Sequence, residues 1–466
     1  MPFPRGIEFQ NGVSTLYGLL SKWWARSGRY SFIIKKLHDK YGPVVRIGPN
    51  LLDLDLPELV KQIYTTDDRW VKTEFYKNSS SIINGKQTYH IFSTLDPADH
   101  ARMKRPIAKY FSISHVLDLE PHMNTVIEDL IKHLDKQADP QKPCDLGSWI
   151  GFYAWDLITS ATFSRRFGYM DAGHDFDGSL AMSDKTADYF GSIGQLPWLD
   201  YLLEKNPIVR IGPPNMDNVT RIALESFAAR VQGLDPHYDP ATPDYLQHFL
   251  DTKARHPESV DDGTIMGYLL IRAVFYFCLK HPAEYRRLAA EVRAAGFDAG
   301  APVPYRAARQ LPFLDAVVRE AMRLHPAVGM VLERYVPAGG LTLPDGRYVP
   351  AGTAVGLNPY VVGRNREVWS EDADEFRPSR WLRSDGETET KHKARLQKMN
   401  GADLAFGAGA RICIGRNIAL VEIYKVVATL VNRYDFELQN PDQEWQVAYR
   451  WFMAQKGLVT KISLRT

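Results

Sequence analysis

The feature that most restricts what this chain can fold into is a glycine-rich segment with one cysteine near the C-terminus. Residues 406–415 read FGAGARICIG, and a predicted helix follows at roughly 415–433. The apolar positions of that helix recur with helical spacing at Ala419, Ile423, Val426 and Leu430. Cys413 therefore lies just before a helix N-terminus, where free N–H groups and the helix dipole favour a thiolate. The only other cysteines are Cys144 and Cys278, so a disulfide framework is not indicated.

The residue types around Cys413 fit a protein that holds haem. A thiolate is a proximal ligand that pushes electron density toward haem iron. Gly407 and Gly409 permit a tight turn without side chains that would hold the haem away. Arg411 can reach a haem propionate, and Phe406 can pack against the sulfur and the macrocycle. We therefore predict that Cys413 is the metal ligand, although a buried structural cysteine beside a glycine-rich turn is an alternative.

The same segment resembles the haem-binding signature of the cytochrome P450 family, F-x-x-G-x-R-x-C-x-G, and all five specified residues match. The resemblance runs from residues 40–43 (KYGP) to the C-terminus, and is closest to fungal secondary-metabolism members such as pisatin demethylase. It implies haem b (iron protoporphyrin IX) as cofactor. It also implies a monooxygenase that inserts one oxygen atom from O2 into a lipophilic small molecule, with electrons from NADPH-cytochrome P450 reductase.

Three further residues match a structural network of this family. Glu320 and Arg323 lie three residues apart on one face of a predicted helix, and Arg380 follows in the segment FRPSRW. The resemblance implies that the three meet in a buried Glu-Arg-Arg cluster. Within the segment that carries Arg380, Ser379 and Trp381 depart from the family pattern. We interpret the cluster as structural because a buried guanidinium–carboxylate network is costly to break.

Haem carries two propionates, which need cationic or polar partners besides Arg411. Arg334 matches a family position for this role. His100 and Lys104 lie four residues apart on one helix face and match another, although the family usually has arginine where Lys104 stands. An ordinary basic helix face is the alternative interpretation for these two residues.

The central helix that normally crosses the distal haem face looks shortened. Its family motif, A/G-G-x-D/E-T-T, is absent, and the sequence looks deleted between Ile271 and Arg272. A helix over 261–280 would span about 30 Å, against a domain width of roughly 60 Å. We therefore assign no catalytic residue. The chain is either a mis-spliced form of a monooxygenase, a haem-thiolate isomerase or dehydratase acting on peroxides, or a non-catalytic haem-binding protein.

The remaining pattern predicts a mainly α-helical α+β fold, a single P450 domain over 1–466. We expect a helix over 13–41, a hairpin near 44–54, and mostly helices over 57–330. Strands with a turn at Asp345-Gly346 should follow over 336–356, then an irregular stretch over 357–400, and short strands over 434–465.

Composition and charge restrict the partners. The net charge of +2 gives no indication of nucleic acid. No run of about 18 apolar residues indicates a transmembrane helix, and peripheral membrane contact stays open. We expect an intracellular monomer, at the endoplasmic reticulum membrane surface if the full-length protein has an anchor and cytoplasmic otherwise. Apolar pocket walls are expected from 82–92, 327–330 and 452–454, which suggests a lipophilic substrate.

Overall fold

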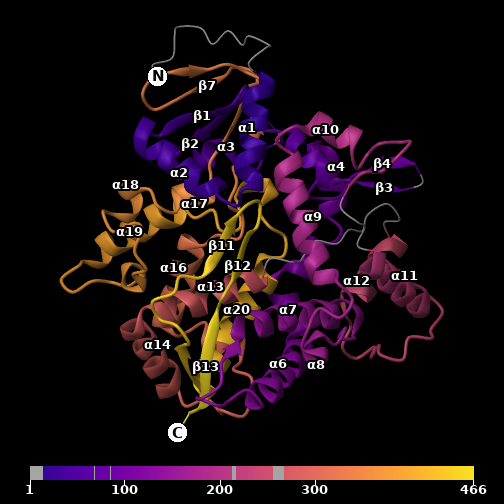
Figure 1. The fold of residues 1–466 in the computed structure, drawn as a ribbon, viewed down its shortest axis with the longest axis vertical. Coiled ribbons are helices and arrows are strands. Elements are labelled where there is room, and N and C mark those ends of the chain that lie inside the picture. Colours follow the sequence, from indigo (N-terminus) through magenta and orange to yellow (C-terminus); the bar gives the residue numbers. More distant parts are fainter. Residues whose placement is uncertain (1–13, 68, 84, 213–216, 256–266, 466) are drawn as a thin grey trace.

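The computed structural model describes residues 14–67, 69–83, 85–212, 217–255 and 267–465. Helices dominate, and small sheets lie near both ends of the molecule (Figure 1), which confirms the predicted α+β class. None of the helices that the structure describes is both long and apolar enough to cross a membrane.

The predicted single helix over 13–41 is wrong, because two helices occupy this stretch. α1 (Ser14–Arg26) and α2 (Tyr30–Tyr41) are separated by a break at Gly28, whose φ of +69° lies in the left-handed region. The Gly28 carbonyl accepts a hydrogen bond from the Tyr449 N–H at 2.7 Å. The break thus places the link between α1 and α2 against the C-terminal part of the chain.

The sheet beside α1 and α2 carries Arg334, one of the residues predicted to bind the cofactor. β1 (Val44–Gly48) and β2 (Leu51–Leu54) form the predicted hairpin, and the strand order is β1-β2-β9-β6. β9 (Ala354–Gly356) is parallel to β2 and antiparallel to β6 (Arg334–Tyr335), so Arg334 is held by an edge strand. β7 (Leu341–Thr342) and β8 (Tyr348–Val349) form the second predicted hairpin, with Asp345-Gly346 in its turn.

The core is built from long helices around α20 (Arg416–Arg433), which is buried on nearly all sides and includes the whole predicted apolar stripe. α6 (Glu120–Asp135), α7 (Leu146–Phe163), α13 (Gly267–Lys280), α14 (Pro282–Ala294) and α16 (Pro312–Leu324) contribute to the same hydrophobic cluster. The other helices are α3 (Val60–Ile63), α4 (Pro97–Lys104), α5 (Ile113–Asp118), α8 (Tyr169–Ala172), α9 (Ser179–Ile193), α10 (Pro197–Leu202), α11 (Asp217–Val231), α12 (Tyr245–Arg255), α15 (Tyr305–Ala308), α17 (Pro359–Val362) and α18 (Arg366–Trp369). Short 3₁₀ helices are η1 (Pro57–Leu59), η2 (Glu74–Ser79), η3 (Ala108–Phe111), η4 (Pro378–Trp381) and η5 (Gly409–Arg411).

The C-terminal strands confirm the prediction over 434–465. β10 (Tyr434–Leu438), β13 (Val459–Leu464) and β5 (Cys144–Asp145) form one antiparallel sheet, and β11 (Gln446–Tyr449) pairs with β12 (Met453–Lys456). β3 (Ser81–Ile83) and β4 (Lys86–Thr88) make a separate hairpin.

The predicted irregular stretch over 357–400 is wrong at its end, where α19 (Glu389–Gly401) forms. Thr388 caps this helix by accepting the Lys391 N–H, and Glu389 pairs with Lys393 one turn later. Only Met399 is buried, so the helix lacks the apolar periodicity that would have indicated it.

The described part of the central helix is short. α13 has 14 residues, so it extends about 21 Å. The predicted N-terminal portion, 261–266, lies outside the described residues.

Candidate active site

The cysteine loop is seated tightly against the segment that follows α3. Gly407 and Gly409 have φ values of +70° and +66°, which other residues rarely adopt. A Cβ on Gly409 would lie 2.3 Å from the Tyr64 carbonyl oxygen and 2.5 Å from that of Thr65. The Ala410 N–H donates to the same Thr65 oxygen at 3.0 Å. Gly409 is thus required for the close backbone contact as well as for the turn.

The Cys413 thiol lies where the loop enters α20. Its backbone N–H donates to the Phe406 carbonyl at 2.9 Å, which closes the loop. Burial raises the pKa of the thiol, whereas the N–H groups of Gly415 and Arg416 and the charge of Lys104 lower it, and the net direction is upward. The helix start therefore acts as predicted, but it does not by itself outweigh burial. A bound metal cation would supply the missing stabilisation, because coordinating thiols lose their proton.

One cavity of about 410 Å³ brings together every residue that the sequence assigned to the cofactor. This volume is in the usual range for small-molecule sites. The residues come from the cysteine loop, from β6 and from α4. They are Phe406, Arg411, Cys413, Arg334, His100 and Lys104.

The cysteine loop and α4 are tied to each other. Arg411 donates to backbone carbonyls in the segment before α4, including Thr94 at 2.9 Å, and Lys104 donates to the Ala410 carbonyl at 2.7 Å. α4 itself begins at Pro97 because the Asp96 side chain caps it by accepting two backbone N–H groups. The Asp96 cap fixes where α4 begins, and the contacts with the cysteine loop hold the helix against the cavity. Together they position His100 and Lys104 there.

The cavity wall is crowded with basic side chains and lacks an opposing charge. Burial, then Arg334 and Arg411, lowers the pKa of Lys72 well below its usual value. Burial and these neighbouring cations lower the pKa of His100 to about 3, and burial and Arg411 lower that of Lys104. No carboxylate is among the described residues that line the cavity. A ligand with two negative charges would relieve this repulsion, so the residues present fit the two propionates of haem b.

Lys72 was not found by sequence reasoning. Its ammonium group donates to the Phe92 carbonyl at 2.6 Å and lies 4.1 Å and 4.2 Å from the ring centroids of Tyr76 and Phe92. A single lysine in a loop looks like a solvated surface residue, and nothing in its neighbourhood in the sequence signals burial.

The predicted pocket walls are found in part. His90, Ile91 and Phe92 line the cavity from 82–92, Val328 from 327–330, and Phe452 from 452–454, whereas Ile82 is exposed. The sequence missed the wall formed by α9, which contributes Ser183, Thr186, Ala187 and Phe190. No described residue of α13 lines the cavity, which agrees with a shortened distal helix.

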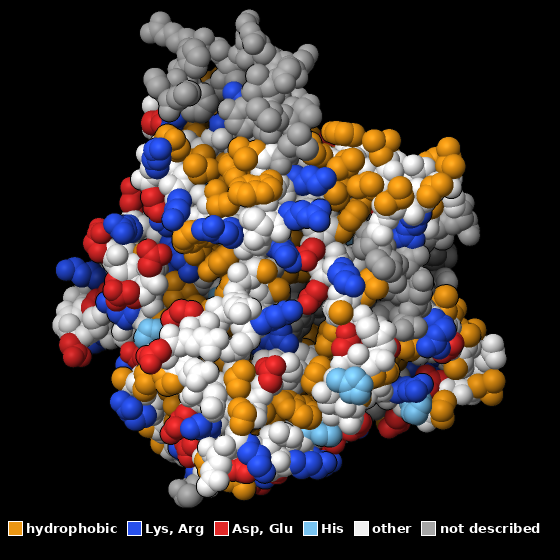
Figure 2. Space-filling model, in the orientation of Figure 1, with side chains coloured by type: hydrophobic (Ala, Val, Ile, Leu, Met, Phe, Trp, Pro, Cys, Tyr) orange, Lys and Arg blue, Asp and Glu red, His pale blue; other side chains and the backbone are white. Residues whose placement is uncertain are grey.

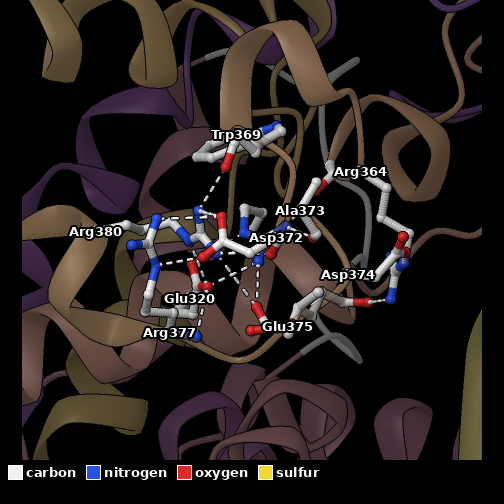
Figure 3. Close-up of polar contacts among 12 residues, drawn as sticks. Glu320, Arg364, Trp369, Asp372, Ala373, Asp374, Glu375, Arg377 and Arg380 are labelled. Carbon is white, nitrogen blue, oxygen red and sulfur yellow. Dashed lines mark hydrogen bonds and ion pairs between the residues drawn. The ribbon is translucent and has the colours of Figure 1, made fainter.

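The predicted Glu-Arg-Arg residues meet in a buried cluster (Figure 3). Arg323 donates to Glu320 through both Nε at 2.9 Å and Nη2 at 2.7 Å, and Arg380 Nε donates to Oε1 at 2.8 Å. The Arg377 backbone N–H and the Trp381 indole N–H also donate hydrogen bonds to the Glu320 carboxylate, at 3.0 Å and 2.9 Å. Trp381, which departs from the family pattern, is thus a further partner of Glu320.

This cluster joins α16 to the segment 369–380 and lies away from the cavity. Burial alone would raise the pKa of Glu320, but the hydrogen bonds and charges of Arg323 and Arg380 lower it, so the carboxylate is ionised. Arg380 also donates to the carbonyls of Trp369 and Asp372. None of Glu320, Arg323 and Arg380 lines the cavity, which supports a structural role.

The family model for cytochrome P450 matches residues 15–462. This chain belongs to the cytochrome P450 family. Cytochrome P450 monooxygenase cfoH of Aspergillus candidus is 43% identical over 471 positions, which cover 97% of this chain and 87% of that protein. Cytochrome P450 monooxygenase cicH of Emericella nidulans is 32% identical, with 97% and 92% covered, and vrtE of Penicillium aethiopicum is 33% identical, with 94% and 85% covered.

Family membership establishes the haem b cofactor, a small-molecule substrate and a redox partner. The names of the relatives support a haem-thiolate monooxygenase of fungal secondary metabolism. They do not favour the peroxide isomerase, the dehydratase or the non-catalytic haem protein.

The comparison also bears on the shortened helix. The 471 aligned positions cover 97% of 466 residues, about 452, so about 19 positions of the relative lie opposite gaps in this P450. A helical segment of that length makes about five turns. This number of positions is large enough for a gap at the predicted deletion between Ile271 and Arg272.

Proposed function

We propose that this P450 inserts one oxygen atom from O2 into an apolar small molecule, with Cys413 as the proximal ligand of haem b. The observation that carries the proposal is the cavity in which Cys413 lies with four lysine and arginine side chains, two histidines and, among the described lining residues, no carboxylate. The proposal treats residues 1–466 as one haem-binding domain.

Bound haem b supplies the activation of O2, and the thiolate favours cleavage of the O–O bond. The protein residues position and insulate this group. The Cys413 thiolate would accept hydrogen bonds from the backbone N–H groups of Gly415 and Arg416, and Phe406 would shield the sulfur from water. Arg411, Arg334, His100, Lys104 and Lys72 would neutralise and orient the propionates.

We propose that NADPH-cytochrome P450 reductase is the electron donor and that the protein is a monomer.

We also propose that the protein contacts the surface of the endoplasmic reticulum membrane. Exposed apolar side chains gather at the end of the molecule that carries α1 and α10 (Figure 2). They are Leu20, Trp23, Trp198, Tyr201, Leu202, Ile208, Val209 and Ile211. Tryptophan and tyrosine among aliphatic residues are typical of surfaces that enter the membrane interface.

The test combines the purified haem-loaded chain with the reductase, NADPH, isotopically labelled O2 and a panel of apolar molecules. A product that carries one labelled oxygen and disappears in Cys413→Ala supports the proposal. Cys278→Ala, which removes a buried cysteine far in sequence from the loop, is the matched control and should retain activity. Peroxide rearrangement without reductase would instead favour the isomerase, and haem binding with neither reaction would favour the non-catalytic protein.

A further inference from the structure

Three aromatic rings from distant parts of the chain form one wall of the cavity. Phe92 lies in the loop after β4, Phe190 on α9 and Trp451 in the turn between β11 and β12. Their ring centroids are 5.6 Å apart for Phe92 and Phe190, 5.8 Å for Phe92 and Trp451, and 4.8 Å for Phe190 and Trp451. Each pair is edge-to-face, the favourable arrangement for aromatic rings. The three rings therefore stabilise one another along the cavity wall, where Phe92 is the most exposed of them and Phe190 and Trp451 pack behind it.

Backbone contacts fix this wall in place. A Cβ on Gly191 would lie 3.1 Å from the Trp451 Cβ, so the glycine lets α9 approach the turn closely. The Asn78 side chain donates to the Phe190 carbonyl at 2.9 Å, and the Gly329 N–H donates to the Trp451 carbonyl at 3.0 Å. Because the rings are held before a ligand arrives, a flat ligand would bind without paying to order them.

The same face of α9 carries two hydroxyl groups next to the aromatic wall. Ser183, Thr186, Ala187 and Phe190 follow helical spacing and all line the cavity. Along the helix axis, Thr186 lies about 6 Å and Ser183 about 10 Å from Phe190. Neither hydroxyl hydrogen-bonds another of the residues that the structure describes, so each can serve a ligand.

We propose that the substrate is a neutral, fused-ring aromatic molecule that carries hydroxyl or carbonyl oxygens. Its rings would pack on the wall formed by Phe92, Phe190 and Trp451. An oxygen on the end of the ring system that points along α9 would hydrogen-bond Thr186 or Ser183. An amine cation is disfavoured, since no carboxylate is among the described lining residues to pair with it. This inference rests on the proposed function, because it places the substrate in the cavity assigned to haem.

The test compares three probes of similar size: naphthol, naphthalene and decahydronaphthol. Binding is measured by calorimetry and by the change in haem absorbance on the haem-loaded chain. Naphthol should bind about threefold to tenfold more tightly than either other probe, as expected for one hydrogen bond or one aromatic contact.

The variants separate the two contributions. Thr186→Val should remove the advantage of naphthol over naphthalene, and Thr186→Ser should restore it, while Phe190→Leu should remove the advantage over decahydronaphthol. Equal affinity of the native chain for all three probes would overturn the proposal, as would equal loss of naphthol and naphthalene in Thr186→Val. A chain without haem would refute the proposed function instead, and calorimetry would still test the aromatic wall.

Discussion

Two buried tryptophans provide a matched test of the charged cluster around Glu320. The indoles of Trp369 and Trp381 pack with ring centroids 5.4 Å apart, and both side chains are buried. Trp381 donates to the Glu320 carboxylate at 2.9 Å, and Trp369 donates to the neutral Val362 carbonyl at 2.8 Å. Substitution of either by phenylalanine removes the same atoms and one hydrogen bond, so the main difference is the charge of the acceptor.

The expected magnitudes follow from that difference. A hydrogen bond to a charged group contributes about 1.5–3 kcal/mol, and one to a neutral group about 0.5–1.5 kcal/mol. The packing lost with the smaller ring is similar at the two positions and cancels in the comparison. We therefore expect Trp381→Phe to lower the free energy of unfolding by about 1–1.5 kcal/mol more than Trp369→Phe does.

Urea unfolding of the haem-loaded variants, followed by circular dichroism, measures this difference. Because the pKa of Glu320 is depressed, its contribution is fully present above the ordinary value of 4.5 and is lost as the pH falls through the lower folded pKa. The gap between the two variants should thus persist at neutral pH and narrow in acid. Equal losses at neutral pH, or a larger loss for Trp369→Phe, would refute the reasoning.

Three further predictions concern other parts of the chain. Gly409→Ala should lower the free energy of unfolding by about 1–3 kcal/mol and reduce haem loading, because the new Cβ would clash with the Tyr64 carbonyl and the residue has a positive φ. A variant that takes up haem to the same extent as the native chain would contradict this. Burial lowers the pKa of His38, but the Asp53 carboxylate, 3.5 Å from Nε2, raises it above 6.5 overall. Stability from this pair is therefore present below pH 6.5 and lost as the pH rises through the folded pKa; urea titrations should show a steeper decline in the native chain than in His38→Gln, and parallel curves would refute it. Sequencing the transcript across Ile271–Arg272 should reveal an in-frame insert with D/E-T-T, and an uninterrupted transcript would show that the short helix is natural.

The residues around the cysteine could be predicted because their chemistry is written in a short local pattern. Cys413, Arg411 and Phe406 lie within eight residues, and the structure gathers Arg334, His100 and Lys104 at the same cavity. The helices with apolar stripes were predictable for a similar reason, since burial on one face imposes a period on the sequence.

The features that were missed depend on tertiary contacts without a local pattern. Lys72 is basic and isolated in sequence, and only the folded cavity shows that it is buried among cations. α19 is polar on most sides, so only its cap and ion pair indicate a helix. The break at Gly28 is fixed by a contact with Tyr449, more than 400 residues away.

The central claim is that the Cys413 sulfur binds the haem iron, and X-ray absorption at the iron edge tests it most directly. The native ferric chain should show one sulfur ligand to iron. That ligand should be absent in Cys413→Ala and retained in Cys278→Ala. A sulfur ligand that survives Cys413→Ala, or a native chain whose haem iron has none, would contradict the account.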